Sequence, residues 1–317
     1  MKLISKEAIS TSFEAESRED WAARITQALG TAVDPLIVDH CVGTRPDHSY
    51  RKWQHQFEIG ECFVISSNDH AQLNTINSQI LSTLEGGVQH IYLRVDTSLD
   101  SVALDTICQG VKLDYIHITL VVNAKHDIVI PQSWDSQYYT VRDKDQLSLR
   151  LDHTEAPDIA IATCLDQIAQ MMESKQSPHT YTVSVSISDA YLMEIARLRA
   201  LHHTYNLLNS QYDWKHRLSI EASYLLNPTS VSDYQKIANT ASGLAAILGG
   251  ATVVLPFGLE PTDQEEVRIA RNQLHLLRLE SYIDKVSDPL AGSHTIEYRT
   301  DQIARSAWER LTKLQST

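Results

Sequence analysis

The sequence predicts an α/β fold, a TIM-type (β/α)8 barrel of parallel strands preceded by an N-terminal extension. Strand-like and helix-like segments alternate along most of the chain, which is typical of right-handed βαβ units and a parallel sheet. Three of the helix-like segments end in glycine, the favoured residue after a last helical turn. A length of 317 residues suits one large barrel with an extension, because α/β barrels reach about 250 residues or more as one domain.

Seven segments have the composition and pattern of strands. They are CFVISS from Cys62, HIYLRV from His90, YIHITLVV from Tyr115, LSLRLD from Leu147, TYTVSVSI from Thr180, RLSIEAS from Arg217 and ATVVLP from Ala251. The eighth strand that closes a barrel is either DIVIP from Asp127 or QYYTV from Gln137. An open doubly wound sheet is the rival fold, but no GxGxxG turn follows the first strand, which weakens a dinucleotide-binding version.

Five helix-like segments with an apolar stripe lie between these strands. They begin at His70, Ser98, Pro157, Asp189 and Ser230. The segment from Asn123 to Gln146 has no such stripe, so the sequence predicts a short or irregular connection there.

Composition and charge exclude several classes of protein. No apolar run approaches the ~20 residues that cross a bilayer, and the polar, acidic N-terminus does not have the pattern of a signal or transit peptide. The sequence therefore predicts no membrane span and a cytoplasmic location. A formal charge of −13 argues against nucleic acid as a partner, because phosphate neutralisation needs a basic field. Cys41, Cys62, Cys108 and Cys164 have no metal-site spacing and are expected to be reduced core residues.

The most informative segment runs from Pro261 to Leu311 and predicts a helix, a DPLAGS turn and a second helix. Val267, Ala270, Leu274, Leu277 and Tyr282 are spaced as one apolar helix face that packs on the layer beneath. The Asp288-Pro289 pair is expected to prevent helical continuation, and Gly292 to supply a backbone position without side-chain clash. Most residues of this segment are therefore interpreted as scaffold.

The same segment resembles the end of the substrate-binding barrel of the methylmalonyl-CoA mutase family. The resemblance rests on Glu265-Glu266 and Arg268 to Asn272, then on Asp288, Pro289, Gly292 and Ser293, and then on Ala307-Trp308. Upstream, MEIARLRA from Met193 and ASGLAAILGGATVVLP from Ala241 also resemble the family, and REDWAARITQALG around Trp21 resembles the opening helix of its small, non-catalytic subunit. The resemblance implies a mutase-like barrel over residues 58–317 and an N-terminal extension over residues 1–57 that docks on a partner or on this chain's own barrel.

The resemblance also implies which cofactor the mutases use and where this sequence departs from them. Family mutases bind cobalamin through a separate domain with a D-x-H-x-x-G motif, and these 317 residues contain no such motif. The expectation is that this chain binds no cofactor by itself and that adenosylcobalamin is carried by a catalytic partner subunit.

Four positions of the family's pocket are predicted to be degenerate here. Alignment of a Glu-Ala pair on Glu155 and Ala156 puts Asp152 at the position of a family His, with His153 one place away and expected to point to the opposite face. After the seventh strand, Glu221 and Ser223 stand in the run where the mutases carry Arg-Thr followed by His, Ser and Gln. An acidic Glu221 is expected to repel the carboxylate and phosphates of an acyl-CoA. No catalytic residue is assigned to the chain.

Two other sets of polar residues carry weaker hypotheses. His202 and His203, near Glu194, lack HExxH spacing, so no metal site is assigned to them. Asp114 with His117, and Asp152 with His153, are conceivable acid/base pairs at a barrel mouth, although turn and cap roles explain these residue types better.

The sequence favours a non-catalytic partner that pairs, as a heterodimer, with a cobalamin-carrying subunit interconverting methylmalonyl-CoA and succinyl-CoA. The alternative is a stand-alone degenerate barrel that has lost mutase chemistry and binds another small ligand. Mutase activity completed by a separate cobalamin protein is the least favoured, because of Asp152 and Glu221. A homodimer and an acyl-CoA ligand both stay open.

Overall fold

The computed structural model describes residues 57–123, 125–143, 149–173, 180–212, 216–224, 232–257, 264–285 and 288–315, together with residues 23, 24, 26 and 27. Within these ranges, eight strands form one sheet in the order β4-β3-β2-β1-β8-β7-β6-β5. The strands are β1 (Glu58–Ile65), β2 (His90–Val95), β3 (His117–Val122), β4 (Tyr139–Asp143), β5 (Arg150–Leu151), β6 (Thr180–Ile187), β7 (Arg217–Tyr224) and β8 (Val253–Val254). Every paired neighbour is parallel.

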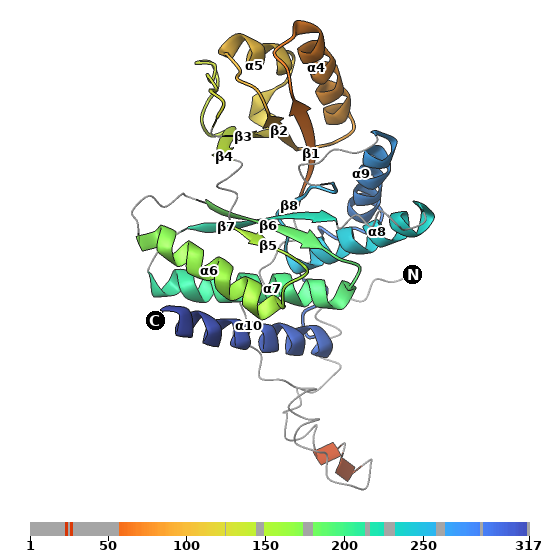
Figure 1. Ribbon diagram of the computed structural model, residues 1–317. Helices are drawn as coiled ribbons and strands as arrows, with labels where there is room; N and C mark the ends of the chain where they lie inside the picture. The colour runs from red at the N-terminus through yellow and green to blue at the C-terminus, as the bar shows by residue number, and fades with distance from the viewer. Residues whose placement is uncertain are drawn as a thin grey trace, which may run out of the picture.

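This strand order is that of a TIM-type barrel, and it confirms the predicted fold class. Sequential strands are neighbours, and β1 returns to pair with β8 through the register Glu58↔Val253 and Ile59↔Val254. Among the described residues no ladder joins β4 to β5, so the curled sheet is open on that side. Figure 1 shows β1 to β4 and β5 to β8 as two groups of strands that meet where β1 lies beside β8.

The helices lie outside the sheet. They are α4 (His70–Glu85), α5 (Ser101–Ile107), α6 (Pro157–Glu173), α7 (Tyr191–Gln211), α8 (Ser232–Gly249), α9 (Gln264–Leu279) and α10 (His294–Gln315), with a short 3-10 helix, η2 (Leu113–Tyr115). In Figure 1, α4 and α5 cover the β1 to β4 group, whereas α6 and α7 cover the β5 to β8 group with α10 beneath them.

The two-residue period of the strands separates an outer core from an inner one. In β2, Ile91 and Leu93 face the helices and belong to the large outer core. Tyr92 points the other way and joins a smaller inner cluster, whose members are Cys62, Tyr92, Val121, Val253 and Leu255. Alternate residues of a strand therefore point into the barrel interior.

Local sequence signals predicted most element positions well. The three helix-terminal glycines, Gly87, Gly110 and Gly250, all have a positive φ, as the left-handed cap requires. The fourth strand is the second of the two candidate segments, Tyr139–Asp143, whereas Ile128 of the first candidate forms only an isolated bridge with Leu99. The strand expected from Leu147 is limited to Arg150–Leu151 in the described residues.

The segment that resembles the mutases folds as the expected helix, turn and helix. Asp288 has a φ of 34° and Gly292 a φ of 83°, so the turn depends on two left-handed backbone positions. Asp288 also forms a buried bidentate ion pair with Arg199 of α7, and Arg199 Nε donates to the Leu248 carbonyl (3.2 Å). The MEIARLRA and DPLAGS motifs are therefore joined by one buried ion pair, which supports their interpretation as scaffold.

Arg197 has a similar structural role two residues earlier in α7. Its guanidinium donates to the Ser186 carbonyl (2.6 Å) at the end of β6 and to the Asp152 carbonyl (3.3 Å) after β5. Glu194 accepts from the Ser188 backbone N–H (3.1 Å) and hydroxyl (2.6 Å). This part of α7 thus fixes the carboxyl ends of two neighbouring strands.

Some expectations need correction or lie outside the described residues. Tyr282 does not join the apolar face of α9, because the helix ends at Leu279 and Tyr282 is 60% exposed. Trp21, Trp53 and Cys41 lie outside the described residues, as does most of the proposed extension, so the division at residue 57 stays a prediction. Cys62, Cys108 and Cys164 are buried and not in disulfides, as expected.

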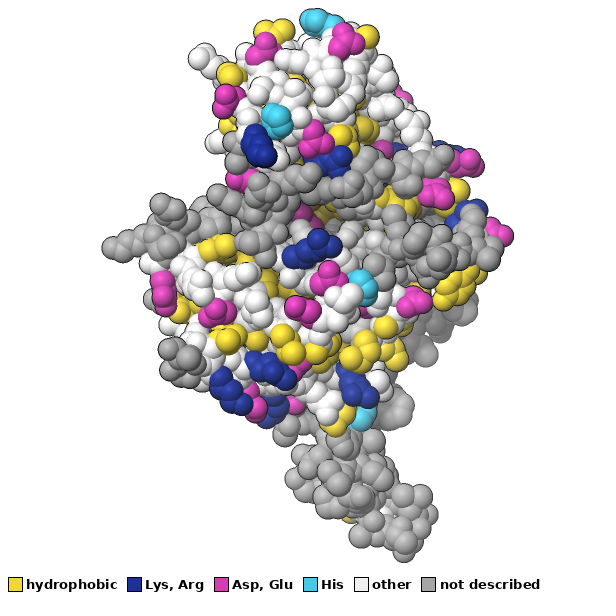
Figure 2. All heavy atoms as spheres, in the orientation of Figure 1, with side chains coloured by type: hydrophobic (Ala, Val, Ile, Leu, Met, Phe, Trp, Pro, Cys, Tyr) yellow, Lys and Arg dark blue, Asp and Glu magenta, His cyan; other side chains and the backbone are white. Residues whose placement is uncertain are grey.

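The surface and the helices fit the composition of the chain. None of the helices in the described ranges is long and apolar enough to cross a bilayer. Figure 2 shows Lys and Arg side chains interspersed with Asp and Glu on the face that it presents. The formal charge of −13 is therefore not gathered into one acidic field on that face.

Candidate functional site in the barrel interior

A carboxylate stands at the centre of the interior polar cluster. Glu221 lies on the inner side of β7, because Ile220 and Ala222 on either side of it pack in the outer core. One Glu221 oxygen, Oε1, accepts from the Tyr92 hydroxyl (2.7 Å) and lies 2.6 Å from Arg142 Nη1. Since Tyr92 comes from β2 and Arg142 from β4, these contacts link the two groups of strands across the interior.

Because Tyr92, Glu221 and Arg142 are largely buried, their charges and hydrogen bonds depend on one another. Tyr92 is fully buried and Glu221 is 7% exposed, so the carboxylate is not presented to solvent. Burial raises the pKa of Tyr92 well above its usual value, and the neighbouring Glu221 charge raises it further. Tyr92 is thus held neutral as a hydrogen-bond donor, and Arg142 compensates the charge of Glu221.

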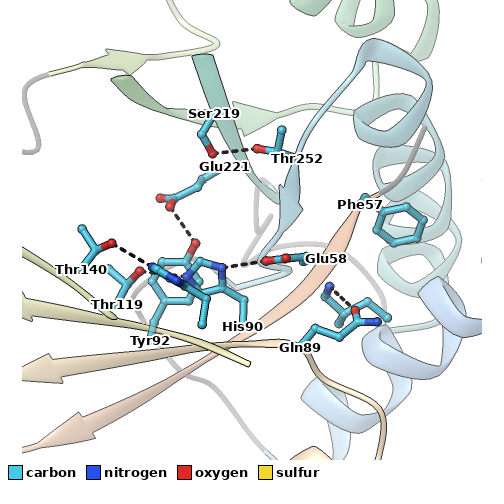
Figure 3. Close-up of polar contacts among 12 residues, drawn as sticks. Phe57, Glu58, Gln89, His90, Tyr92, Thr119, Thr140, Ser219, Glu221 and Thr252 are labelled. Atoms are coloured by element: carbon cyan, nitrogen blue, oxygen red, sulfur yellow. Dashed lines mark hydrogen bonds and ion pairs between the residues drawn. The ribbon is translucent and has the colours of Figure 1, made fainter. Parts of the chain in front are cut away.

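A second network lies at the amino end of the strands, as Figure 3 shows. His90 Nδ1 is 3.0 Å from Glu58 Oε2, and His90 Nε2 is 2.8 Å from the Thr119 hydroxyl. The His90 ring also stacks on Tyr92, with the centroids 4.4 Å apart. The first network therefore continues through aromatic packing into the second.

His117 extends this second network on β3. Its Nε2 is 2.8 Å from the Thr140 hydroxyl, and its ring meets His90 edge-on. Burial lowers the pKa of His117 to about 4, and the nearby His90 adds to the effect. His117 is therefore neutral at pH 7 and is suited to hydrogen bonding inside the barrel.

The predicted site residues Asp152 and His153 lie elsewhere, at the carboxyl end of β5. β5 ends at Leu151, so both residues are in the following turn, and strand alternation does not apply to them. Their side chains do not point apart as expected, since His153 Nδ1 lies 3.0 Å from Asp152 Oδ1. Hydrogen bonds from the Thr154 backbone lower the pKa of Asp152. The pair occupies the end of a barrel where active sites are usually found.

The structure does not gather the four predicted pocket positions into one contact group. Glu221 is paired with Tyr92 and Arg142 in the interior, and Asp152 and His153 contact each other in the turn after β5. Ser223 is half-buried at the end of β7, and its hydroxyl makes one long contact, 3.5 Å, with the Val185 carbonyl. Whether these positions are degenerate pocket residues stays a prediction.

The weaker candidates are placed away from the usual functional end. His117 begins β3 and Asp114 is exposed just before it, so both lie at the amino end of the strands. His202 is half-buried, and its Nε2 lies 2.9 Å from the Gly250 carbonyl after α8. In the part of the chain that the structure describes, no group of three or more His, Cys, Asp or Glu side chains could hold a metal ion.

Sequence reasoning identified Glu221 but missed the partners of its side chain. A carboxylate on the inner face of a strand needs a cation, which is a signal that could have prompted a search. The chain has 27 Lys and Arg residues, however, and nothing local in the sequence selects Arg142. The sequence also leaves the position of β4 open between two segments, so it does not identify the inward-facing residues of that strand.

Comparisons with known proteins agree with the resemblance carried by the sequence motifs. Residues 162–317 match the model of the family described as methylmalonyl-CoA mutase. This match runs from α6 to the end of the chain and includes Arg199, Glu221 and Asp288, whereas Asp152 and His153 precede it.

Individual relatives match over similar parts of the chain. A methylmalonyl-CoA mutase small subunit from Porphyromonas gingivalis is 33% identical over 134 residues, covering 39% of this chain and 22% of the relative. A methylmalonyl-CoA mutase from Rhizobium meliloti is 29% identical over 137 residues, covering 40% of this chain and 19% of the relative. A methylmalonyl-CoA mutase small subunit from Propionibacterium freudenreichii is 26% identical over 171 residues, covering 49% of this chain and 27% of the relative. The chain thus spans about a fifth of the length of the first two relatives. Residues 162–317 of this chain are therefore similar to the methylmalonyl-CoA mutase family.

Proposed function

We propose that this protein is a non-catalytic, small-subunit-like partner of a cobalamin-dependent subunit that interconverts methylmalonyl-CoA and succinyl-CoA. Several similar proteins bear the name methylmalonyl-CoA mutase small subunit. In this proposal the pair is a heterodimer, adenosylcobalamin is bound by the catalytic partner, and the complex works in the cytoplasm.

The observation that carries the proposal is the arrangement of side chains inside the barrel. Tyr92, Glu221 and Arg142 contact one another across the interior, and Tyr92 is fully buried. An acyl-CoA carries carboxylate and phosphate groups that need uncommitted cations. Arg142 reaches the interior, but its Nη1 lies 2.6 Å from Glu221, so its charge is already compensated. The interior therefore suits a packed scaffold better than a substrate pocket.

Two measurements on the full chain test this proposal. Tagged protein, mixed with the catalytic mutase subunit of the same cell, is expected to elute from a sizing column as a stoichiometric complex. Without that subunit, the chain with adenosylcobalamin is expected to give no conversion of methylmalonyl-CoA and no base-off, His-ligated cobalamin spectrum. Turnover by the isolated chain that disappears in His153→Ala would contradict the non-catalytic role.

The alternative is a stand-alone barrel that binds another small ligand, and one feature favours it. A cleft of about 940 Å³ is lined by residues of α4, β1 and α9, and its volume is within the range of small-molecule sites. Its walls include Phe63, Phe257 and Val267 on the apolar side and Arg268 and Arg271 on the polar side. Failure of the chain to bind any catalytic subunit, combined with normal folding, would favour this alternative.

A further inference from the structure

A second cavity, of about 580 Å³, opens at the amino end of the barrel strands. Its walls include Glu58, Gln89, His90, Thr252, Arg278 and Asp284. This end lies opposite Asp152 and His153, which follow the carboxyl end of β5. The cavity therefore lies at the end of the barrel opposite to the one where barrel active sites are usually found.

Most polar groups around this cavity are already satisfied by one another. The Ser219 and Thr252 hydroxyls are 2.8 Å apart, and Thr252 also accepts from the Ile220 backbone N–H (2.9 Å). Both ring nitrogens of His90 have partners, in Glu58 and Thr119. These groups form a fixed wall and do not require a ligand.

Arg278 also has hydrogen-bond partners, and these are neutral groups. Its Nη1 donates to Gln89 Oε1 (3.1 Å) and its Nη2 to the Phe57 carbonyl, while the guanidinium lies over the Phe57 ring at 4.3 Å from the centroid. Burial lowers the pKa of Arg278, and the nearby charges of Asp284 and Glu58 oppose that effect. Both carboxylates thus lie near Arg278, whereas its hydrogen bonds to Gln89 and Phe57 involve neither of them.

The carboxylates of Asp284 and Glu58 can still accept further hydrogen bonds. Asp284 has a side chain only 12% exposed, and its Oδ1 has no hydrogen-bond partner among the described residues. Its other oxygen, Oδ2, lies 3.5 Å from Nζ of the exposed Lys285. Glu58 is half exposed and uses Oε2 for His90. A buried carboxylate oxygen without a donor is costly, so a donor is expected to complete it.

We propose that this cavity binds a small organic ammonium compound. Two carboxylates and one guanidinium give the wall a net negative charge, which a ligand cation would balance. The ammonium N–H groups donate to Asp284 and Glu58, and the carbon skeleton lies against Phe57 and Val253. A carboxylate or phosphate ligand is disfavoured in the same place, because it would meet two like charges.

Butylammonium is a suitable probe, with 1-butanol and butyrate as neutral and anionic analogues of similar size. Binding to the full chain is measured by ligand-detected NMR titration at 0.15 M salt, where the Debye length is about 8 Å and general attraction to an acidic protein is screened. Saturable binding of butylammonium is expected, with neither analogue binding detectably. Asp284→Asn and Glu58→Gln should each weaken binding at least about tenfold, because each removes a charge-assisted hydrogen bond.

Glu85→Gln is the matched control, since Glu85 is exposed on α4 and not part of the cavity wall. It removes the same charge and should leave binding unchanged. Melting curves confirm that the variants fold, and Glu58→Gln provides a second test if Asp284→Asn is unstable. The proposal is overturned if butylammonium does not saturate, if 1-butanol binds as well, or if folded cavity variants bind like the Glu85→Gln control.

Discussion

Replacement of Asp288 by Asn tests whether the family motifs serve as scaffold. Arg199 and Asp288 are both buried, with side chains 3% and 1% exposed. The substitution keeps the size of the side chain, and Asn tolerates the left-handed backbone of this turn. It can still accept from the Leu290 backbone N–H, a bond of 3.2 Å in the native turn. The main loss is therefore the charge that compensates buried Arg199.

The expected cost of Asp288→Asn is about 3–5 kcal/mol in the free energy of unfolding, because it removes a charged partner of the buried Arg199 guanidinium. At roughly 2–4 °C per kcal/mol for chains of this size, the melting temperature should fall by about 10 °C. Urea titration, monitored by circular dichroism, gives the free energy of unfolding. A thermal melt gives the melting temperature. Removal of both charges in Arg199→Met with Asp288→Asn should cost less than the sum of the single changes.

The exposed pair of Asp301 and Arg305 in α10 supplies the control. The two residues are separated by four positions, and their atoms lie 2.7 Å apart with Arg305 largely in solvent. Asp301→Asn should cost no more than about 0.5 kcal/mol, because exposed helix pairs contribute little. If Asp288→Asn costs as little as Asp301→Asn, the buried ion pair does not hold the two motifs together, and the scaffold argument is wrong.

Three further predictions concern His117 and His202, then Gly292, and then Tyr92. Burial lowers the pKa values of His117 and His202 to about 4, below the usual 6.5, so the unfolded chain binds more protons between these values. The free energy of unfolding should therefore fall as pH drops from about 6.5 towards 4, and a His117→Gln, His202→Gln double variant should show a shallower fall in urea titrations across that range; equal slopes would contradict this. Gly292→Ala should cost about 1 kcal/mol through its φ of 83° alone, because no atom of the described residues lies within 4 Å of an added Cβ, and Gly292→Asn should recover part of the loss. Tyr92→Phe should cost about 1 kcal/mol, since Glu221 keeps Arg142 as a partner, and a cost above 3 kcal/mol would show that the hydroxyl does more than this geometry indicates.

Much of the fold could be predicted because its signals are local. Helix-terminal glycines and the two-residue period of the strands act within a few residues of their effect. β2 and β6 were placed to the residue for the same reason. The expectation that Asp288 and Pro289 stop the helix was wrong, because α9 already ends at Leu279. The prediction for Tyr282 was wrong because the apolar spacing continues past the end of α9 at Leu279. Tyr282 itself has a left-handed backbone, with a φ of 51°.

The interior site could be predicted only in part, because its contacts are not local. The hydroxyl of Tyr92 meets Glu221 from a position 129 residues away, and Arg142 meets it from 79 residues away. The alternation of residues along a strand predicts which side chains point inward. Which inward side chains meet, however, depends on how the sheet closes. The sequence therefore indicated an acidic residue in the barrel without showing that Arg142 neutralises it.

The central claim is that the barrel of this chain supports a catalytic partner and does not itself act on substrate. The most direct measurement is the turnover of methylmalonyl-CoA by the reconstituted pair, with Tyr92→Phe or His153→Ala introduced in this chain only. The account predicts that the complex forms and that turnover stays within about twofold of the unmodified pair, since neither side chain touches substrate. A loss of tenfold or more with the complex intact would place substrate chemistry in this barrel and contradict the account.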